Sequence, residues 1–214
     1  MILYHGSAKR IEHPFPDGGN AFNDFGDGFY CTQHRLLAGE WACSSVRGGF
    51  INEYSFNTDG LHILNLQDGK YTILNWLALL VVNRNLRLRT PLSVRGAQWL
   101  RDYHLIDISA ADLIIGYRAD DSYFAFARAF LNNEISLSQL SEAMHLGQLG
   151  EQYVIKTQTA YDQLTFTGAE RADGSAYYPK RISRDRRARE DFDLIRKRDD
   201  LNGIYLIDLM RSMN

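Results

Sequence analysis

Short apolar runs bounded by glycine or polar residues predict the strands of this chain. The first run covers residues 1–6 and stops at Gly6, which places His5 at the end of a strand. A polar loop over residues 8–28 precedes a second short strand, "GFYCT", and loops of that length in compact domains are usually functional. Alternating or apolar runs predict the remaining strands, at residues 51–57, 62–66, 113–117 and 151–157.

Apolar residues spaced three and four apart predict helices between these strands. These helices are expected at residues 34–45, 72–84, 93–104 and 122–133. Ser122 is predicted to cap the last of them. Ser136, with Gln139 three residues later, predicts a capping box at the start of another helix, and Gly147 predicts its end.

The composition suits one domain, or one domain with an appendage. The chain has 214 residues and a formal net charge of −2, so it carries no global basic signature of nucleic-acid binding. Its two cysteines, Cys31 and Cys43, form no disulfide framework or metal-type cluster, which favours a cytoplasmic setting. The N-terminus lacks the apolar core of a signal peptide. The most apolar run, residues 73–82, is about half the length of a membrane span, so we expect a buried helix and no membrane association.

The composition changes after Phe166. We therefore expect a domain over residues 1–166 and a C-terminal basic extension, residues 167–214, packed on the same domain. Residues 180–198 hold nine Lys or Arg against four Asp or Glu. The simplest interpretation of this run is a solvated helix. The functional alternative is an arm that binds an acidic or phosphate-bearing target.

Three stretches resemble signature motifs of the ADP-ribosyltransferase superfamily. "LYHGS" (3–7) and "FGDGFYCT" (25–32) resemble the first two motifs of its diphtheria-toxin-like and poly(ADP-ribose)-polymerase-like branch, the His-Tyr-Glu branch. "GEQYVIKT" (150–157) stands where that branch has a glutamate directly before an apolar strand. Through "GYRADD" and "YYPKR", the chain also resembles a bacterial family of unknown function that is grouped with these transferases.

The resemblance implies an α+β fold, a split β-sandwich in which two small, mostly antiparallel sheets form a cleft and helices surround them. It also implies NAD as the substrate, with cleavage of the bond between nicotinamide and ribose. No metal is implied, and the six histidines of the chain suggest no metal site.

The resemblance assigns roles to five residues along NAD. His5 would hydrogen-bond the adenosine-side ribose with Ser7 beside it, and Gly6 would pair its backbone with the nicotinamide amide, because no Cβ blocks the approach. Tyr30 would stack on the nicotinamide ring. Trp41, eleven residues later, would close the other face of that ring.

Glu151 and Gln152 compete for the third catalytic position. Side chains alternate along a strand, so only one of them faces the ribose unless a bulge intervenes. The family register matches Gln152, whose neutral amide can hydrogen-bond a hydroxyl but is a poor base. With Gln152 in place, three alternatives stay open: transfer to an already strong nucleophile, slow transfer, or use of a carboxylate from elsewhere in the chain. The candidates for that carboxylate are Asp120 and Asp121, in the polar turn with Arg118. The simpler interpretation of these three residues is a salt-bridged turn.

The resemblance therefore predicts a cytoplasmic NAD-dependent ADP-ribosyltransferase that moves a single ADP-ribose to a protein or nucleic-acid target and releases nicotinamide. Two alternatives stay open. One is a module on the same fold that binds NAD or ADP-ribose without transfer, which a glutamine at position 152 favours. The other is a nucleic-acid-associated toxin or regulator that docks through its basic arm, with an antitoxin or regulator as a further partner.

Overall fold

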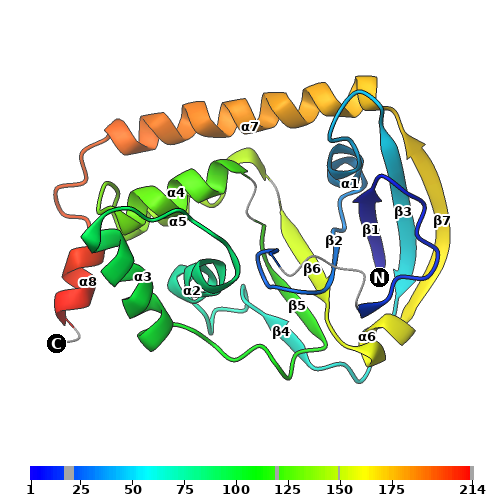
Figure 1. Ribbon diagram of the computed structural model, residues 1–214, viewed down its shortest axis with the longest axis horizontal. Coiled ribbons are helices and arrows are strands. Elements are labelled where there is room, and N and C mark those ends of the chain that lie inside the picture. The colour runs from blue at the N-terminus through cyan, green and yellow to red at the C-terminus, as the bar shows by residue number, and fades with distance from the viewer. Residues whose placement is uncertain (17–21, 119–120, 149, 213–214) are drawn as a thin grey trace.

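The strands form two sheets in the computed structural model, which describes residues 1–16, 22–118, 121–148 and 150–212. A three-stranded antiparallel sheet has the order β1-β3-β7, and a four-stranded sheet has the order β2-β6-β5-β4, in which β4 and β5 are parallel. The strands are β1 Ile2–Ser7, β2 Phe29–Cys31, β3 Gly49–Phe56, β4 Ile63–Asn65, β5 Leu113–Tyr117, β6 Glu151–Ile155 and β7 Leu164–Ala172. The mixture of separate helices and mostly antiparallel sheets confirms the α+β class (Figure 1).

Helices pack on both sheets. Helix α1 lies against β1 and β3, while α2 to α5 lie beside the four-stranded sheet (Figure 1). The helices are α1 Arg35–Ala42, α2 Ile73–Asn83, α3 Pro91–Tyr103, α4 Asp121–Leu131, α5 Leu137–Ala143, α6 Gln158–Asp162, α7 Gly174–Lys197 and α8 Leu206–Ser212. Capping boxes at Thr72, Thr90 and Ser136 start α2, α3 and α5. Within the described ranges, no helix is long and apolar enough to cross a bilayer.

The two sheets meet at an isolated bridge and separate beyond it. Tyr4 of β1 and Thr32, just after β2, exchange backbone hydrogen bonds of 2.7 and 2.9 Å. Past this bridge β1 stays paired with β3, whereas β2 pairs with β6. The apolar core between the sheets includes Leu3, Tyr54, Phe56, Phe29, Ile115 and Tyr153. Strands β1 and β2 therefore form a fork whose two arms belong to different sheets.

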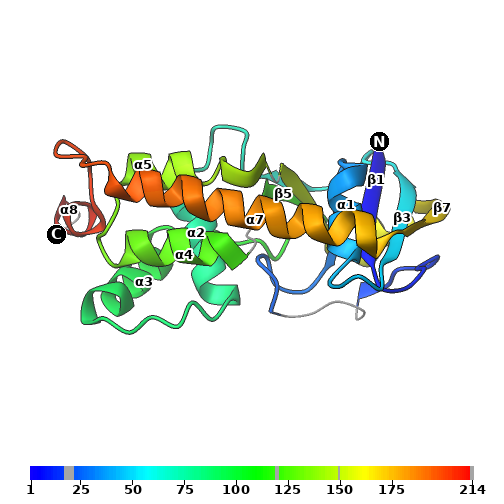
Figure 2. The same ribbon diagram turned by 90° about the horizontal axis from the view of Figure 1, so that it is seen from above.

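The long helix α7 connects the two halves of the molecule (Figure 2). It contacts α1 near one end and α4 and α5 toward the other. Its residues Ala188, Phe192 and Ile195 are buried in the main core, where the ring centroid of Phe192 lies 4.2 Å from that of Phe126. The exposed positions of α7 are mostly polar, as its sequence predicts, with Ile182 and Leu194 as apolar exceptions.

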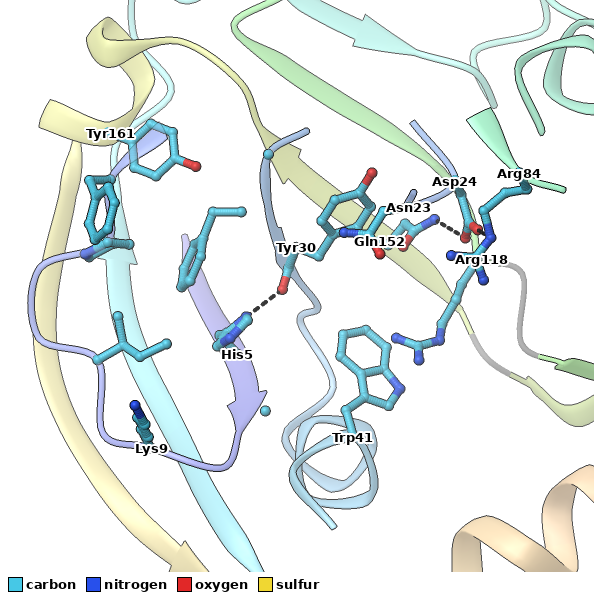
Figure 3. A pocket seen from close by; sticks show the side chains of 16 residues that line it. His5, Lys9, Asn23, Asp24, Tyr30, Trp41, Arg84, Arg118, Gln152 and Tyr161 are labelled. Carbon is cyan, nitrogen blue, oxygen red and sulfur yellow. Dashed lines mark hydrogen bonds and ion pairs between the residues drawn. The ribbon is translucent and has the colours of Figure 1, made fainter. Parts of the chain in front are cut away.

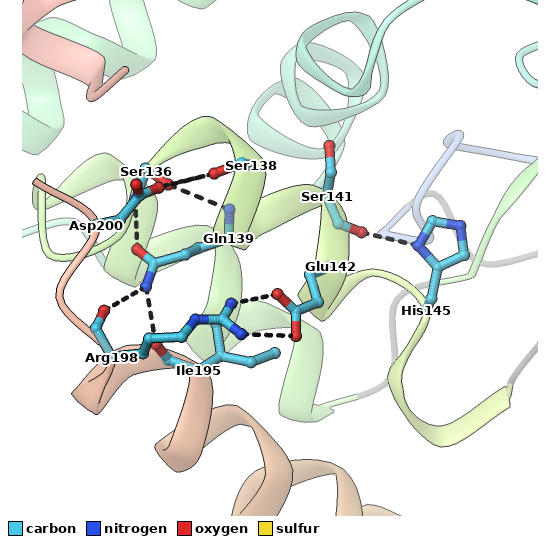
Figure 4. A network of polar contacts seen from close by, with 9 residues as sticks. All are labelled: Ser136, Ser138, Gln139, Ser141, Glu142, His145, Ile195, Arg198 and Asp200. Atoms are coloured by element: carbon cyan, nitrogen blue, oxygen red, sulfur yellow. Dashed lines mark hydrogen bonds and ion pairs between the residues drawn. The ribbon is translucent and has the colours of Figure 1, made fainter. Parts of the chain in front are cut away.

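A polar network ties the segment after α7 to the start of α5 (Figure 4). Asp200 Oδ2 accepts a hydrogen bond of 2.6 Å from the Ser136 hydroxyl. Gln139 Nε2 donates to the carbonyl oxygens of Ile195 and Arg198, both at 2.8 Å. Gln139 and Ser136 also form the predicted capping box, so the sequence feature that starts α5 also holds the C-terminal segment.

Strand β7 crosses the domain boundary that the composition suggested. The change after Phe166 falls inside this strand, and residues 167–172 continue its pairing with β3. The sequence pattern did not predict β7, because it is an edge strand with mostly exposed or half-buried side chains and carries no strong apolar alternation. The first sheet is therefore completed by residues from the C-terminal extension.

Two helix ends differ from the sequence prediction. Helix α4 begins at Asp121, so Ser122 is buried within the first turn and does not occupy the capping position. Helix α5 ends at Ala143, four residues before Gly147. The glycine instead lies in a following 3-10 turn, where its φ of 70° is in the left-handed region that glycine adopts readily. The predicted cap at Ser122 is therefore wrong, and α5 is shorter than predicted because a separate 3-10 turn, which contains Gly147, follows it.

Candidate functional site

A cleft of about 630 Å³ lies in the fork between the two sheets (Figure 3). Six of the residues singled out from the sequence line it: five come from four elements, and the sixth, Arg118, directly follows β5. His5 and Gly6 lie on β1, Tyr30 on β2, Trp41 on α1 and Gln152 on β6. The fold thus brings the three motif regions to one space, although they are far apart along the chain.

His5 presents one ring nitrogen to this cleft as an acceptor. Its Nδ1 lies 2.8 Å from the Tyr30 carbonyl oxygen, and because a carbonyl can only accept, Nδ1 carries the hydrogen. Burial lowers the pKa of His5 to about 4, so the ring is neutral at pH 7 and Nε2 is a hydrogen-bond acceptor. The ring stacks on Phe29, with centroids 4.2 Å apart.

Gly6 lies where a strand edge opens onto the cleft. Backbone groups alternate sides along a strand, and those of Tyr4 point toward Thr32. The backbone N–H and C=O of Gly6, two residues later, therefore point toward the same edge of β1. At that position β2 no longer runs beside β1, because it pairs with β6. Helix α1 also approaches here, since a Cβ on Gly6 would lie 1.9 Å from the Ala38 carbonyl oxygen.

Tyr30 is held in place through its hydroxyl, which leaves its ring to line the cleft. The hydroxyl donates to the Gly26 carbonyl at 2.6 Å and accepts from the Phe25 N–H at 3.0 Å. Burial raises the pKa of Tyr30 well above its ordinary value, so this hydroxyl stays protonated. Lys156 Nζ donates to the carbonyl oxygens of Phe25 and Asp27, which anchors the same turn to the end of β6.

Trp41 lies across the cleft from Tyr30 and Gln152 (Figure 3). The guanidinium carbon of Arg118 lies 3.6 Å from the Trp41 ring centroid, in a cation–π contact. Trp41 Nε1 is buried and has no hydrogen-bond partner among the residues that the structure describes. A buried donor without a partner in the wall of a cleft is a feature that a bound ligand can satisfy.

Gln152, and not Glu151, faces the cleft. Its side chain is buried, and Nε2 donates to Asp24 Oδ2 at 3.0 Å and to the Tyr117 carbonyl at 2.9 Å. These bonds use both amide hydrogens, so Oε1 is the atom left to meet a ligand. Asp24 also pairs with Arg84, whose Nε lies 3.5 Å from Oδ1.

Glu151 points to the opposite face of β6, as the alternation along a strand requires. It lines a separate cavity of about 830 Å³, which His34 and His145 also line. Its carboxylate accepts a hydrogen bond of 3.0 Å from the Tyr153 hydroxyl. The choice between the two residues, open from the sequence, is decided by which face of β6 meets the fork.

Asp24 and Arg84 were not singled out from the sequence. Asp24 lies two residues before Gly26, directly before the second motif, and Arg84 follows the end of α2. Asp24 contacts both Gln152 and Arg84, so it joins three distant points of the chain, and no local pattern encodes these contacts. The only available signal for Asp24 was its place in the long polar loop before β2.

The remaining predicted residues lie elsewhere. The Ser7 hydroxyl donates to the Lys9 carbonyl and accepts from Asn52 Nδ2, and Ser7 is not part of the cleft lining. Asp120 lies outside the described residues, as does the side chain of Asp121. Within the described part of the chain, no group of three or more His, Cys, Asp or Glu is placed to hold a metal ion.

Comparison with known proteins gives one match. A family model described as a protein of unknown function (DUF3990) matches residues 1–166. No curated protein and no solved structure matches the chain. The matched range begins before β1 and ends inside β7, so it contains every residue described above as lining the cleft.

Proposed function

We propose a function from the cleft itself, because the chain belongs to the DUF3990 family of proteins of unknown function. The proposed activity is that of an NAD-dependent ADP-ribosyltransferase, which transfers a single ADP-ribose to a macromolecular target. The observation that carries the proposal is the convergence of His5, Tyr30, Trp41 and Gln152 on one cleft. Its volume of about 630 Å³ is in the usual range for a small-molecule site.

The groups that line the cleft fit the parts of NAD. The neutral His5 ring offers Nε2 to a ribose hydroxyl, which donates the hydrogen. The open strand edge at Gly6 offers an N–H and a C=O to the carboxamide of nicotinamide. The faces of Tyr30 and Trp41 suit the flat nicotinamide ring. Trp41 already holds a planar cation, the Arg118 guanidinium, and the nicotinamide ring of NAD is also planar and cationic.

The proposed reaction breaks the bond between nicotinamide and ribose, and nicotinamide leaves with the electron pair. The target nucleophile bonds to the ribose carbon, and its proton passes to solvent. Gln152 Oε1 would accept a hydrogen bond from a ribose hydroxyl. Behind it, the Asp24 carboxylate, 3.0 Å from Nε2, supplies negative charge near the carbon that becomes positive. Gln152 and Asp24 together would perform the role of one glutamate, with Asp24 as the positioning residue.

The test is incubation with NAD, with chromatography of nicotinamide and mass spectrometry of the modified target. Tyr30→Ala is expected to weaken NAD binding at least about tenfold, because it removes one face of the ring site. Tyr30→Phe keeps that face and is expected to retain binding. Tyr103→Ala, at an exposed tyrosine of α3, is the matched control. Binding and turnover by Tyr30→Ala equal to those of the parent would exclude this assignment.

A module that binds NAD or ADP-ribose without transfer is the second candidate. The observation in its favour is that Gln152 is neutral and buried, so the group nearest the ribose is not itself a base. Titration calorimetry distinguishes the two candidates. Heat of NAD binding with no release of nicotinamide supports the module, whereas nicotinamide release that depends on Gln152 supports the transferase.

A further inference from the structure

Arginine is concentrated in one segment of the chain that contains no acid. Residues 83–101 carry five arginines and no aspartate or glutamate, although the whole chain has a formal net charge of −2. This segment runs from the last residue of α2, through the connection, along most of α3. Positive charge gathered on one part of a net-negative molecule indicates a surface for an anionic partner.

Arg128 of α4 joins this segment at a small cavity of about 330 Å³. The cavity is lined by Arg87, Arg89 and Arg128, together with Thr90 and Asn132. Guanidinium groups bind phosphate oxygens in a bidentate geometry, and hydroxyl and amide groups add further hydrogen bonds. The chemistry of the lining therefore suits a phosphate group.

A second cavity, of about 450 Å³, connects this phosphate-type site to the cleft. Arg87 lines both small cavities, and Arg84 lines both the second cavity and the cleft. Phe22 lies on the second cavity, and its side chain is 73% exposed. The arginine track is defined here as Arg84, Arg87, Arg89, Arg101 and Arg128.

Most of the charge of the track is not neutralised within the protein. Among the residues that the structure describes, no carboxylate forms an ion pair with Arg87, Arg89 or Arg128. Arg84 is the member that pairs with an acid, Asp24. The track therefore keeps a positive potential that extends from the outer cavity to the mouth of the cleft.

Helix α7, which the sequence suggested as the basic arm, is a poorer surface for the same partner. Four arginines of α7 and the arginine directly after it form ion pairs with carboxylates: Arg184, Arg186, Arg189, Arg196 and Arg198. Its excess of positive charge is therefore partly compensated by neighbouring acids. Among the described residues, Lys180, Arg181, Arg187 and Lys197 form no such pair, but the unpaired arginines of the track gather around one small cavity.

We propose that the arginine track binds single-stranded nucleic acid and leads it to the mouth of the cleft. Phosphates would contact the guanidinium groups, and the exposed ring of Phe22 offers a face on which a base can stack. A basic groove beside an aromatic ring is the common construction of single-strand binding sites. An acidic protein would use the charges but not the ring. Binding of nucleic acid to the track does not depend on the proposed NAD chemistry. A role of that nucleic acid as the acceptor of ADP-ribose rests on the proposed transferase function.

The test measures fluorescence anisotropy of a labelled single-stranded oligonucleotide, without NAD, over a series of salt concentrations. The Arg87→Gln/Arg89→Gln variant is expected to bind about tenfold more weakly. Its slope of log affinity against log salt is expected to be shallower by about 1.4, at about 0.7 for each phosphate contact. Arg187→Gln/Lys197→Gln removes the same charge from exposed positions of α7 and is expected to bind like the parent.

Equal weakening in both double variants, or in neither, would overturn the proposal. Displacement of the oligonucleotide by polyglutamate at equal charge concentration would also overturn it, because it would identify the partner as an acidic protein. Oligonucleotide binding by a parent protein that releases no nicotinamide would reject the transfer and support this proposal.

Discussion

Gln152 presents a neutral hydrogen-bond acceptor to the cleft, because its two amide hydrogens are held by Asp24 and by the Tyr117 carbonyl. Asp24 is itself buried and shares its charge with Arg84. At the scale of single residues, the site is therefore a chain of donors and acceptors in which each group is oriented by the next. Because the Gln152 amide donates to the Asp24 carboxylate, the residue that position 152 tolerates depends on the residue at position 24.

Exchanging the acid and the amide tests that dependence. Gln152→Glu would place two carboxylates in contact in a buried site, and is expected to lower the free energy of unfolding at pH 7 by about 3 kcal/mol. Asp24→Asn added to it restores a donor–acceptor pair and is expected to recover most of the loss. Urea unfolding measures both. Glu151→Gln, on the opposite face of β6, is the control, and a Gln152→Glu variant as stable as the parent would contradict the arrangement.

His5 gives the molecule a pH dependence whose sign follows from its environment. Its pKa is about 4 in the folded chain and about 6.5 in an unfolded one, so between these values the unfolded chain binds the extra proton. Stability is therefore expected to fall as the pH falls from 6.5 to 4. In urea unfolding over this range, His5→Gln is expected to lose stability less steeply than the parent. His13→Gln, at an exposed histidine, should follow the parent, and identical slopes for His5→Gln and the parent would reject the assignment.

At the scale of elements, the close approach of α1 to β1 sets the width of the cleft. The absence of a side chain on Gly6 lets the helix backbone reach the strand, and this places Trp41 across from Tyr30. The glycine of the first motif therefore has a packing role besides the role that NAD recognition would give it. The turn before β2 is also closely packed, since a Cβ on Gly28 would lie 2.7 Å from the Val154 side chain.

Gly6→Ala tests this contact between elements. The new methyl group would overlap the Ala38 carbonyl, so α1 must move away from β1, and we expect a loss of about 3 kcal/mol in the free energy of unfolding. Gly168→Ala is the matched control on β7, because nothing lies within 4 Å of its added Cβ. Chemical denaturation of both variants measures the difference. Equal stability of the two would show that α1 does not depend on this approach.

At the scale of the whole molecule, the C-terminal extension and the matched family region share one core. Ala188, Phe192 and Ile195 of α7 are buried among residues of α4 and α5, and β7 completes the first sheet. The family model ends at residue 166, but the packing continues past it. Residues 167–212 are therefore, through β7 and α7, part of the same packed structure as the cleft.

Phe192→Ala tests how much α7 contributes to that core. Removal of a buried aromatic ring that packs against the ring of Phe126 is expected to cost about 3–5 kcal/mol of unfolding free energy. Leu194→Ala, two residues away and 68% exposed, is expected to change it by less than about 0.5 kcal/mol. Thermal and urea unfolding measure both variants. A small effect of Phe192→Ala would mean that the extension is not integral to the core.

Much of the fold could be predicted from periodicity, since β1, β2, β3, β4, β5 and β6 and helices α1, α2 and α3 lie where apolar spacing places them. Strand β7 could not, because a half-exposed edge strand leaves almost no apolar pattern. For the site, His5, Tyr30, Trp41 and Gln152 could be chosen from local motifs, and the structure gathers them in one cleft. Their roles toward NAD stay predictions.

Local order in the chain was determined by the sequence itself: its strand periods, its capping boxes, and the alternation that sends Glu151 and Gln152 to opposite faces. Only the tertiary structure decided that Gln152 faces the cleft, that Asp24 and Arg84 stand behind it, and that Arg128 of α4 joins Arg87 and Arg89 of the α2–α3 connection at one cavity. The physical reason is the separation along the sequence of the residues that interact. Periodicity and capping depend on residues a few positions apart, whereas these contacts join residues brought together only when the two sheets and the helices pack.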